Sequence, residues 1–206
     1  MRLTSPTLQD GEPIPTDHAF AVPDPDVHVT FSDNRNPAFE WDDVPEGTRS
    51  FVLLCIDPDA PTVAVDANQE DREIPADLAR TDFTHWVLVD IPAEARSIAE
   101  AAFCEGVTPR GKSGRQDGPR EGVNDYTAWF EGDADMEGVY KGYDGPCPPW
   151  NDTRVHRYVF TLYALDTDAL PVSGDFTAAD VQEAMSGHVV AEASITVTYT
   201  LNPALI

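Results

Sequence analysis

Lysine is almost absent from this chain, and basic residues of either kind are scarce. Only Lys112 and Lys141 are lysines, and 13 basic residues face 37 acidic ones, which gives a formal net charge of -24 over 206 residues. A surface with this excess of negative charge repels nucleic acid and anionic membranes. We therefore expect neither of them as a partner.

The acidic residues are spread along the whole chain and are not gathered in a tail. Repulsion among them destabilises the compact state in dilute buffer, whereas at about 1 M salt the Debye length falls to roughly 3 Å and the repulsion is screened. The composition therefore predicts a halophilic protein with an acidic surface. An ordinary acidic protein is the alternative.

Cysteine and long apolar runs are also scarce. The three cysteines, Cys55, Cys104 and Cys147, are an odd number without CxxC spacing, which argues against a disulfide framework or a zinc site. The N-terminus lacks the apolar run of a signal peptide, and no stretch approaches the roughly 18 apolar residues of a membrane span. We expect a cytoplasmic protein without integral membrane association, folded as a single domain over residues 1–206.

Short apolar runs rich in Val, Ile, Tyr and Phe dominate the sequence, with Pro, Gly and Asp between them. They predict a mainly β protein, a sandwich of antiparallel sheets. Bulky residues on both faces of the run at 157–165 indicate a central strand. The predicted strands are residues 27–31, 51–56, 85–91, 157–165 and 195–201.

Helices are few in this reading. Thr177 can cap a helix that continues through Val181 and Met185, with Gly187 as a terminator, and residues 93–102 suggest a shorter helix. Two long irregular stretches, 62–82 and 105–123, are typical of functional or disordered loops. The first enters the predicted strand that begins at His85, where it would form a lid or an interface.

Four polar segments lie at strand beginnings and ends. Asp57-Pro58-Asp59-Ala60-Pro61 follows one strand, His85 opens the next, a Gly- and Pro-rich loop spans residues 142–149, and His156-Arg157-Tyr158 opens a third. Taken singly, the first is an ordinary tight turn, and a lone histidine at a strand end is more often structural than functional.

Together, and in this order, these segments resemble the signature segments of the phosphatidylethanolamine-binding family. The segment 122–126, the Cys-Pro-Pro variant of the loop and the segment 187–193 are similar to the bacterial and archaeal Raf-kinase-inhibitor-like branch, and the resemblance spans roughly residues 25–202. It implies two antiparallel sheets with a few peripheral helices. It also implies a pocket for phosphate-like anions or a phospholipid headgroup.

The resemblance carries over to particular positions. His85 and His156 would donate N–H groups to a phosphoryl oxygen, Tyr158 would add a hydroxyl, and Asp57 would orient a histidine tautomer. The ligand-binding residues implied by the family are Asp57, His85, Gly145, Pro146, His156 and Tyr158, with Asp59 and Phe83 at the edge of the pocket.

The expected function is non-enzymatic binding of a small phosphate-like or phosphoethanolamine-type ligand, without a cofactor or metal. No GxSxG, HExxH or GxxxxGK motif supports catalysis. Three alternatives stay open. Asp57 with two histidines has the composition of a metal site of an oxygenase or hydrolase. The protein would otherwise inhibit a kinase or protease, with the pocket as modulator, or form a homodimer through residues 62–82.

Overall fold

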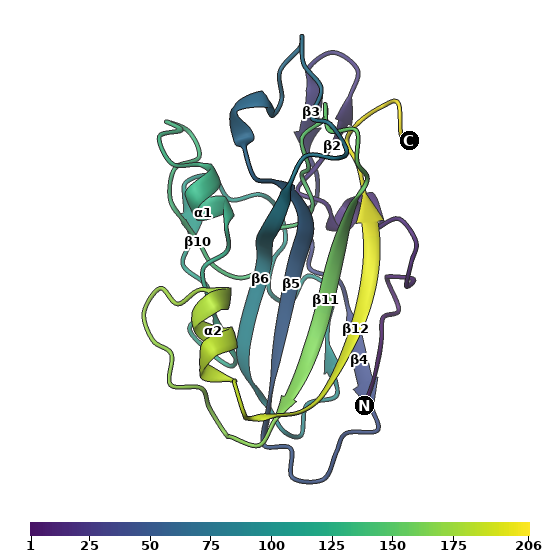
Figure 1. Ribbon diagram of the computed structural model, residues 1–206. Coiled ribbons are helices and arrows are strands. Elements are labelled where there is room, and N and C mark those ends of the chain that lie inside the picture. Colours follow the sequence, from purple (N-terminus) through teal and green to yellow (C-terminus); the bar gives the residue numbers. More distant parts are fainter.

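A five-stranded sheet, antiparallel throughout, runs the length of the molecule (Figure 1). The computed structural model describes residues 1–206, apart from the side chain of Ala64. The strand order is β12-β11-β5-β6-β9. The bounds are β5 Ser50–Pro61, β6 Arg80–Pro92, β9 Arg120–Glu121, β11 His156–Leu165 and β12 Val189–Tyr199.

Shorter elements surround this main sheet. Strands β1, β4 and β7 form a second antiparallel sheet, β2 and β3 form a hairpin, and β8 pairs in parallel with β10. The strand bounds are β1 Arg2–Thr4, β2 Ala21–Asp24, β3 His28–Phe31, β4 Phe39–Asp42, β7 Ser97–Ile98, β8 Gly111–Lys112 and β10 Val139–Tyr140. The helices are α1 Tyr126–Trp129 and α2 Ala178–Ala184, and the 3-10 turns are η1 Thr16–His18 and η2 Ala64–Asp66.

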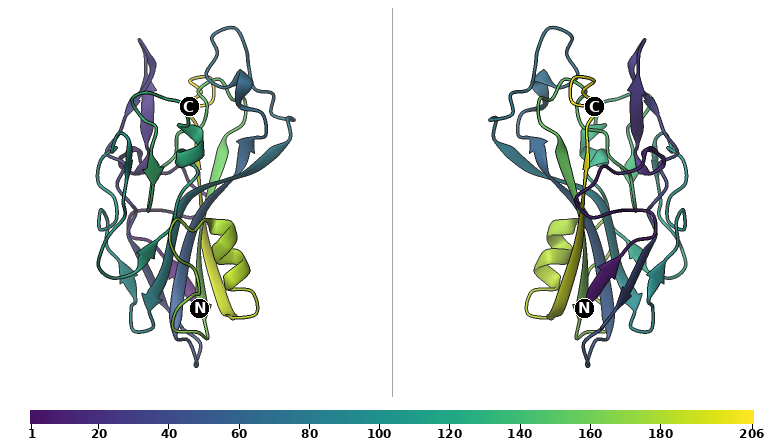
Figure 2. Two further views of the ribbon diagram at one scale, coloured as in Figure 1. Left: turned by 90° about the vertical axis from the view of Figure 1, so that its left-hand side faces the viewer. Right: turned by 90° about the vertical axis from the view of Figure 1, so that its right-hand side faces the viewer.

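The main sheet separates two hydrophobic cores, because side chains of a strand alternate between its faces. On one face, Phe160 of β11 packs against Phe39 of β4 with ring centroids 5.1 Å apart. On the other face, Leu54 and its neighbours share a core with Val181 of α2. Figure 2 shows α2 on one side of the sheet and the short strands on the other.

The prediction of a mainly β protein with few helices is confirmed. Strand β11 lies between β12 and β5, as its pattern predicted, and α2 begins after Thr177 in a capping box with Asp180. Strand β5, however, does not end in a tight turn at Asp57. It continues to Pro61, and the proline-containing segment is accommodated by a register shift between Asp57 and Ala60.

Two local predictions are wrong. Residues 93–102 form turns and strand β7, because Ile98 pairs with Phe39 and is buried in the core, a tertiary contact that outweighs helix propensity. The stretch 105–123 is not wholly irregular, since it contributes β8 and β9. Within the described residues, no helix has the length and apolar character needed to cross a membrane.

Candidate ligand-binding site

A cavity of about 170 Å³ opens at the end of the main sheet where β11 starts and where the pairing of β5 with β6 shifts register. Its polar lining comes from the strands, and most of its apolar wall comes from α1 and the proline-rich loop. The polar group is Asp57, His85, His156 and Tyr158, and the apolar wall includes Phe83, Tyr126, Trp129, Cys147, Pro148 and Pro149.

One ring nitrogen of His85, on β6, is hydrogen bonded to the protein. Its Nδ1 lies 2.8 Å from the backbone oxygen of Asp144 and donates to it, since a carbonyl only accepts. Nε2 has no hydrogen-bond partner among the described residues, and the ring lines the cavity. Burial lowers the pKa of His85, with Asp57 opposing part of the effect. The ring is therefore neutral at pH 7, with a lone pair on Nε2.

His156, the first residue of β11, is bound on both sides. Its Nδ1 lies 2.7 Å from Asp57 Oδ2 and its Nε2 lies 3.0 Å from Asp152 Oδ2. Burial lowers the pKa of His156, but hydrogen bonds to Asp152 and Asp57 outweigh it and raise the pKa to about 9. Because both partners are carboxylates, both nitrogens donate and the ring is an imidazolium.

Asp57 was expected to orient a histidine, and the structure shows it in contact with His156. One carboxylate oxygen accepts from His156, and the other accepts from the backbone N–H of Asp59 at 2.7 Å. Both oxygens are thus hydrogen bonded to the protein. The negative charge of Asp57 is balanced by the imidazolium, which reduces its repulsion of an anion in the cavity.

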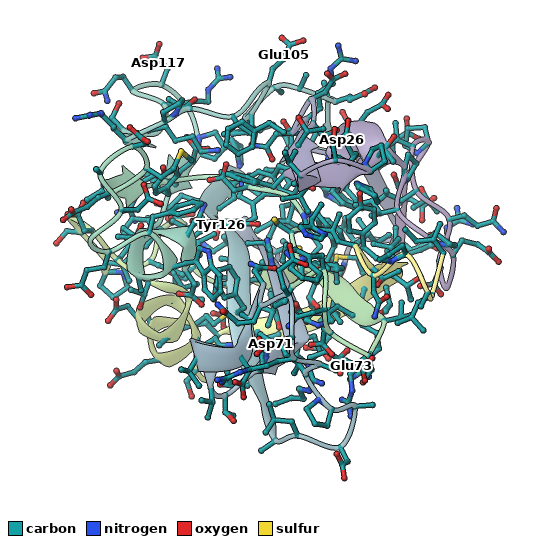
Figure 3. The ribbon with its side chains drawn as sticks, turned by 90° about the horizontal axis from the view of Figure 1, so that it is seen from above. Asp26, Asp71, Glu73, Glu105, Asp117 and Tyr126 are labelled. Atoms are coloured by element: carbon teal, nitrogen blue, oxygen red, sulfur yellow. The ribbon has the colours of Figure 1, made fainter. Side chains whose placement is uncertain are left out.

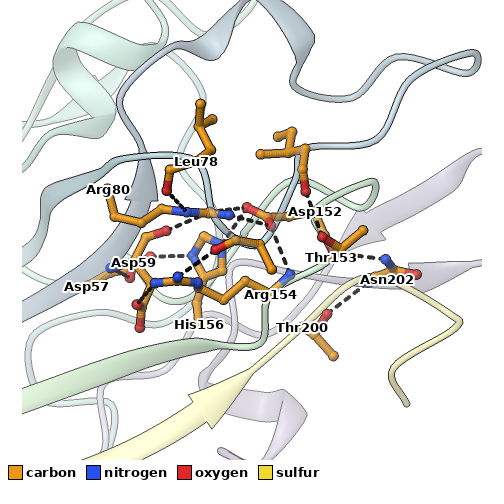
Figure 4. Close-up of polar contacts among 12 residues, drawn as sticks. Asp57, Asp59, Leu78, Arg80, Asp152, Thr153, Arg154, His156, Thr200 and Asn202 are labelled. Carbon is orange, nitrogen blue, oxygen red and sulfur yellow. Dashed lines mark hydrogen bonds and ion pairs between the residues drawn. The ribbon is translucent and has the colours of Figure 1, made fainter.

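An ionic network of residues that do not line the cavity continues from this pair (Figure 4). Asp152 also binds the guanidinium of Arg80, and both side chains are almost completely buried. Asp59 accepts from Arg154 at 2.9 Å and from Arg157 at 2.7 Å. Burial raises the pKa of Asp59, but the two arginines outweigh it and lower the pKa to about 2.

The structure divides the predicted site residues into two groups. Asp57, Phe83, His85, His156 and Tyr158 come together around the cavity. Three others do not line it and have supporting contacts instead, namely Asp59, Gly145 and Pro146.

The supporting role of Gly145 follows from close backbone packing. A Cβ atom there would lie 2.0 Å from the backbone oxygen of His18, so only glycine fits. Its carbonyl accepts from the Tyr126 hydroxyl at 2.7 Å and so positions a wall residue. Pro146 accepts from the backbone N–H of Phe20 at 2.9 Å. The loop reaches the cavity only at the next residue, Cys147.

Several residues of the site escaped prediction. Tyr126 lies in the segment 122–126 that carries the resemblance, and Trp129 follows it three residues later, which is one turn of helix. Asp152 lies four residues before His156, and the sequence spacing alone does not indicate that the two side chains are in contact. Figure 3 looks down on this end of the molecule, with Tyr126 near the middle and acidic residues such as Glu105 and Asp117 at the periphery.

The segment 62–82 does not form a lid over the cavity. Thr62 and Thr81 reach the cavity wall, while the intervening chain packs on the segment 149–154. The Asn151 amide donates to the carbonyls of Asp66, Gln69 and Arg72 at 2.8, 3.3 and 3.0 Å.

The alternative of a two-histidine, one-carboxylate metal site has no matching geometry. His156 directs both ring nitrogens at carboxylates, so it offers no lone pair to a metal. Among the described residues, no group of three or more His, Cys, Asp or Glu side chains is arranged to hold a metal ion.

Fold and site together define a β-sandwich protein with a histidine-lined cavity at one end of its main sheet. The chain belongs to the phosphatidylethanolamine-binding protein family, whose family model matches residues 4–200. This confirms the resemblance seen in the sequence.

Relatives share nearly the whole chain. The UPF0098 protein YbhB of Escherichia coli is 33% identical over 200 residues, covering 97% of this chain and 100% of that protein. A UPF0098 protein of Methanothermobacter thermautotrophicus is 34% identical over 171 residues, covering 83% of this chain and 86% of that protein. The crystal structure of E. coli YbcL, described as a member of the mammalian PEBP family, matches with a TM-score of 0.68 and 28% identity, covering 97% of each chain.

Proposed function

We propose that this protein binds, without chemical turnover, a small phosphate-bearing ligand of the phosphoethanolamine type in the cavity. The observation that carries the proposal is the free Nε2 of His85 in an otherwise largely apolar cavity. Every other histidine nitrogen of the cavity is already bonded to the protein.

The neutral His85 ring needs one proton to bind a phosphate dianion. That proton comes from solvent or from a phosphate monoanion, and it produces a charge-assisted N–H to oxygen hydrogen bond. The Nδ1 contact to the Asp144 carbonyl persists in both forms, so the ring keeps its orientation. Tyr158 lines the cavity and its buried hydroxyl has no partner among the described residues, so a ligand oxygen would satisfy it.

The other end of such a ligand is a cation, and the cavity mouth suits it. Trp129 lines the cavity yet is 41% exposed, which places an aromatic face where the cavity meets solvent. An ammonium group near such a ring gains about 0.5–1 kcal/mol at an exposed site. The acidic surface adds a long-range attraction for the same group and disfavours an anionic bilayer as the ligand source.

Binding without turnover agrees with the state of the only thiol in the wall. Burial raises the pKa of Cys147 to about 12, so it is a protonated thiol and a poor nucleophile at neutral pH. His156, held between two carboxylates, has no lone pair with which to act as a base.

The test is an NMR titration of the histidine ring protons in about 2 M KCl, where surface charge is screened. Phosphoethanolamine, inorganic phosphate and ethanolamine are added in separate titrations. We expect phosphoethanolamine to shift the His85 signals of the wild type. In His85→Gln we expect it to leave the remaining histidine signals unshifted. His188→Gln is the matched control, because His188 is exposed and paired with Asp166 outside the cavity. Unchanged His85 signals, or undiminished binding by His85→Gln, would refute the proposal.

A further inference from the structure

A lysine and a cysteine contact each other in the interior, outside the cavity lining. Lys112 is one of only two lysines, and its Nζ lies 3.0 Å from Sγ of Cys104, one of only three cysteines. The Lys112 side chain is 15% exposed, and Cys104 is 7% exposed. Lysine is seldom buried unless it is paired. In a chain with only two lysines, one is largely buried and contacts a thiol.

Both side chains are held in place. The Lys112 ammonium binds Asp144 Oδ1 at 3.0 Å and contacts the backbone oxygen of Tyr143. The Asn34 amide donates to the sulfur at 3.4 Å and to Asp144 Oδ1 at 2.9 Å. The nitrogen and sulfur therefore face each other without needing a rotamer change.

We propose that Cys104 and Lys112 form an oxidative covalent cross-link in which a single oxygen atom joins Sγ to Nζ. Their separation is close to the span of one bridging atom, whereas a direct nitrogen–sulfur bond would require a much larger approach. The oxidant is dioxygen, which is small enough to reach a buried thiol through ordinary fluctuations of the fold.

The reaction balances with one dioxygen molecule. The ammonium first loses a proton to solvent, which the 15% exposure of the Lys112 side chain allows. One N–H bond, the S–H bond and the O–O bond then break, while an S–O and an O–N bond form. The second oxygen atom leaves as water with the two hydrogens. Sulfur and nitrogen each give up two electrons, and dioxygen accepts all four.

The surroundings direct the thiol to this neighbour. Burial raises the pKa of Cys104, with the Lys112 ammonium opposing part of the rise, so the sulfur is not a generally reactive thiolate. Asp144 holds Nζ beside the sulfur, and the Asn34 and Asn124 amides fix the position of its carboxylate. The cross-link also removes the cation beside Asp144, the residue whose carbonyl holds His85.

The test is mass spectrometry of the full-length protein, purified in parallel under air and under anaerobic reducing conditions. Trypsin would release residues 97–110 with Cys104 and cut after Lys112. In the air-exposed protein we expect residues 97–110 joined to residues 111–115, because a modified lysine is not cleaved. The joined species should exceed the sum of its peptides by one oxygen less two hydrogens, and a phosphine reductant should remove it.

Two variants and one control sharpen the result. Cys104→Ser and Lys112→Arg should both lose the joined species, and Lys112→Arg keeps a cation for Asp144. Cys147→Ser should keep it. If Cys104 is recovered from the air-exposed wild type as a free thiol, or carries oxygen while Lys112 is cleaved normally, the cross-link does not form. A joined species that persists in Lys112→Arg would equally overturn the proposal.

Discussion

The imidazole of His156 is hydrogen bonded through Nδ1 to Oδ2 of Asp57 over 2.7 Å, and both side chains are almost inaccessible to solvent. Because Asp152 accepts from the other ring nitrogen, both N–H groups of His156 are hydrogen bonded within the protein and neither is free to bind a ligand. Of the two histidines predicted to bind ligand, only His85 has a free ring nitrogen. His156 instead ties β11 to β5 and to the segment 149–154.

This arrangement predicts how stability depends on alkaline pH. The pKa of His156 rises from 6.5 to about 9 on folding. A raised folded pKa gives stability that is fully present below the unfolded pKa and is lost as pH rises through the folded value. The loss between pH 6.5 and about 9 should be on the order of 3 kcal/mol.

The measurement is chemical unfolding at high salt over that pH range, for the wild type and His156→Gln. The variant will be less stable near neutrality, because it leaves the buried Asp57 carboxylate without its cation and removes one of the two cations bound to Asp152. Its stability should nevertheless fall less steeply with rising pH. His188→Gln should keep the wild-type slope. Parallel pH profiles for the wild type and His156→Gln would contradict the imidazolium assignment.

Ligand binding should take up protons, because His85 is neutral before binding. Isothermal titration calorimetry in two buffers with different ionisation enthalpies measures the uptake directly. We expect about one proton per bound phosphoethanolamine dianion where the free His85 ring is neutral, and affinity that falls about tenfold per pH unit there. Identical heats in both buffers, with binding retained, would show that Nε2 is already protonated.

The main strands could be predicted from sequence because apolar runs are local signals, whereas the cavity-lining histidines were assigned through the family resemblance of the ordered segments. The pairing of Asp152 with Arg80 and His156 could not be predicted, since it depends on which loops the fold brings together. Gly145 was assigned to the binding site from the resemblance, but its lack of a side chain permits close packing against the backbone of His18. Residues 93–102 looked helical because their strand partner, β4, lies far away in the sequence.

Asp59 distinguishes the two kinds of predicted residue experimentally. It accepts from both Arg154 and Arg157 and does not line the cavity. Asp59→Asn should therefore cost about 1.5–3 kcal/mol of stability, the range for hydrogen bonds to charged groups. Phosphoethanolamine affinity should be unchanged once the protein is folded at high salt. A large loss of affinity in a fully folded variant would return Asp59 to the binding site.

Acid should reveal the same contact. The pKa of Asp59 falls from 3.8 to about 2 on folding, so its contribution is present above pH 3.8 and is lost as pH falls through about 2. Unfolding curves between those limits should show a shallower dependence on pH for Asp59→Asn than for the wild type. Matching slopes would show that Asp59 has the same affinity for protons in both states.

The net charge of -24 predicts that stability depends on salt. Unscreened repulsion should compete with a folding free energy of about 5–15 kcal/mol, so dialysis into low salt should cause reversible loss of structure. Circular dichroism during a salt titration measures the midpoint.

Glu73, Asp77 and Asp117 are exposed and make no ion pair among the described residues. Replacing all three with their amides should lower the midpoint salt concentration, because it removes repulsion without breaking a contact. Wild-type spectra that superimpose at low and high salt would contradict the predicted salt dependence. Equal midpoint salt concentrations for the wild type and the triple variant would show that these surface charges do not set it.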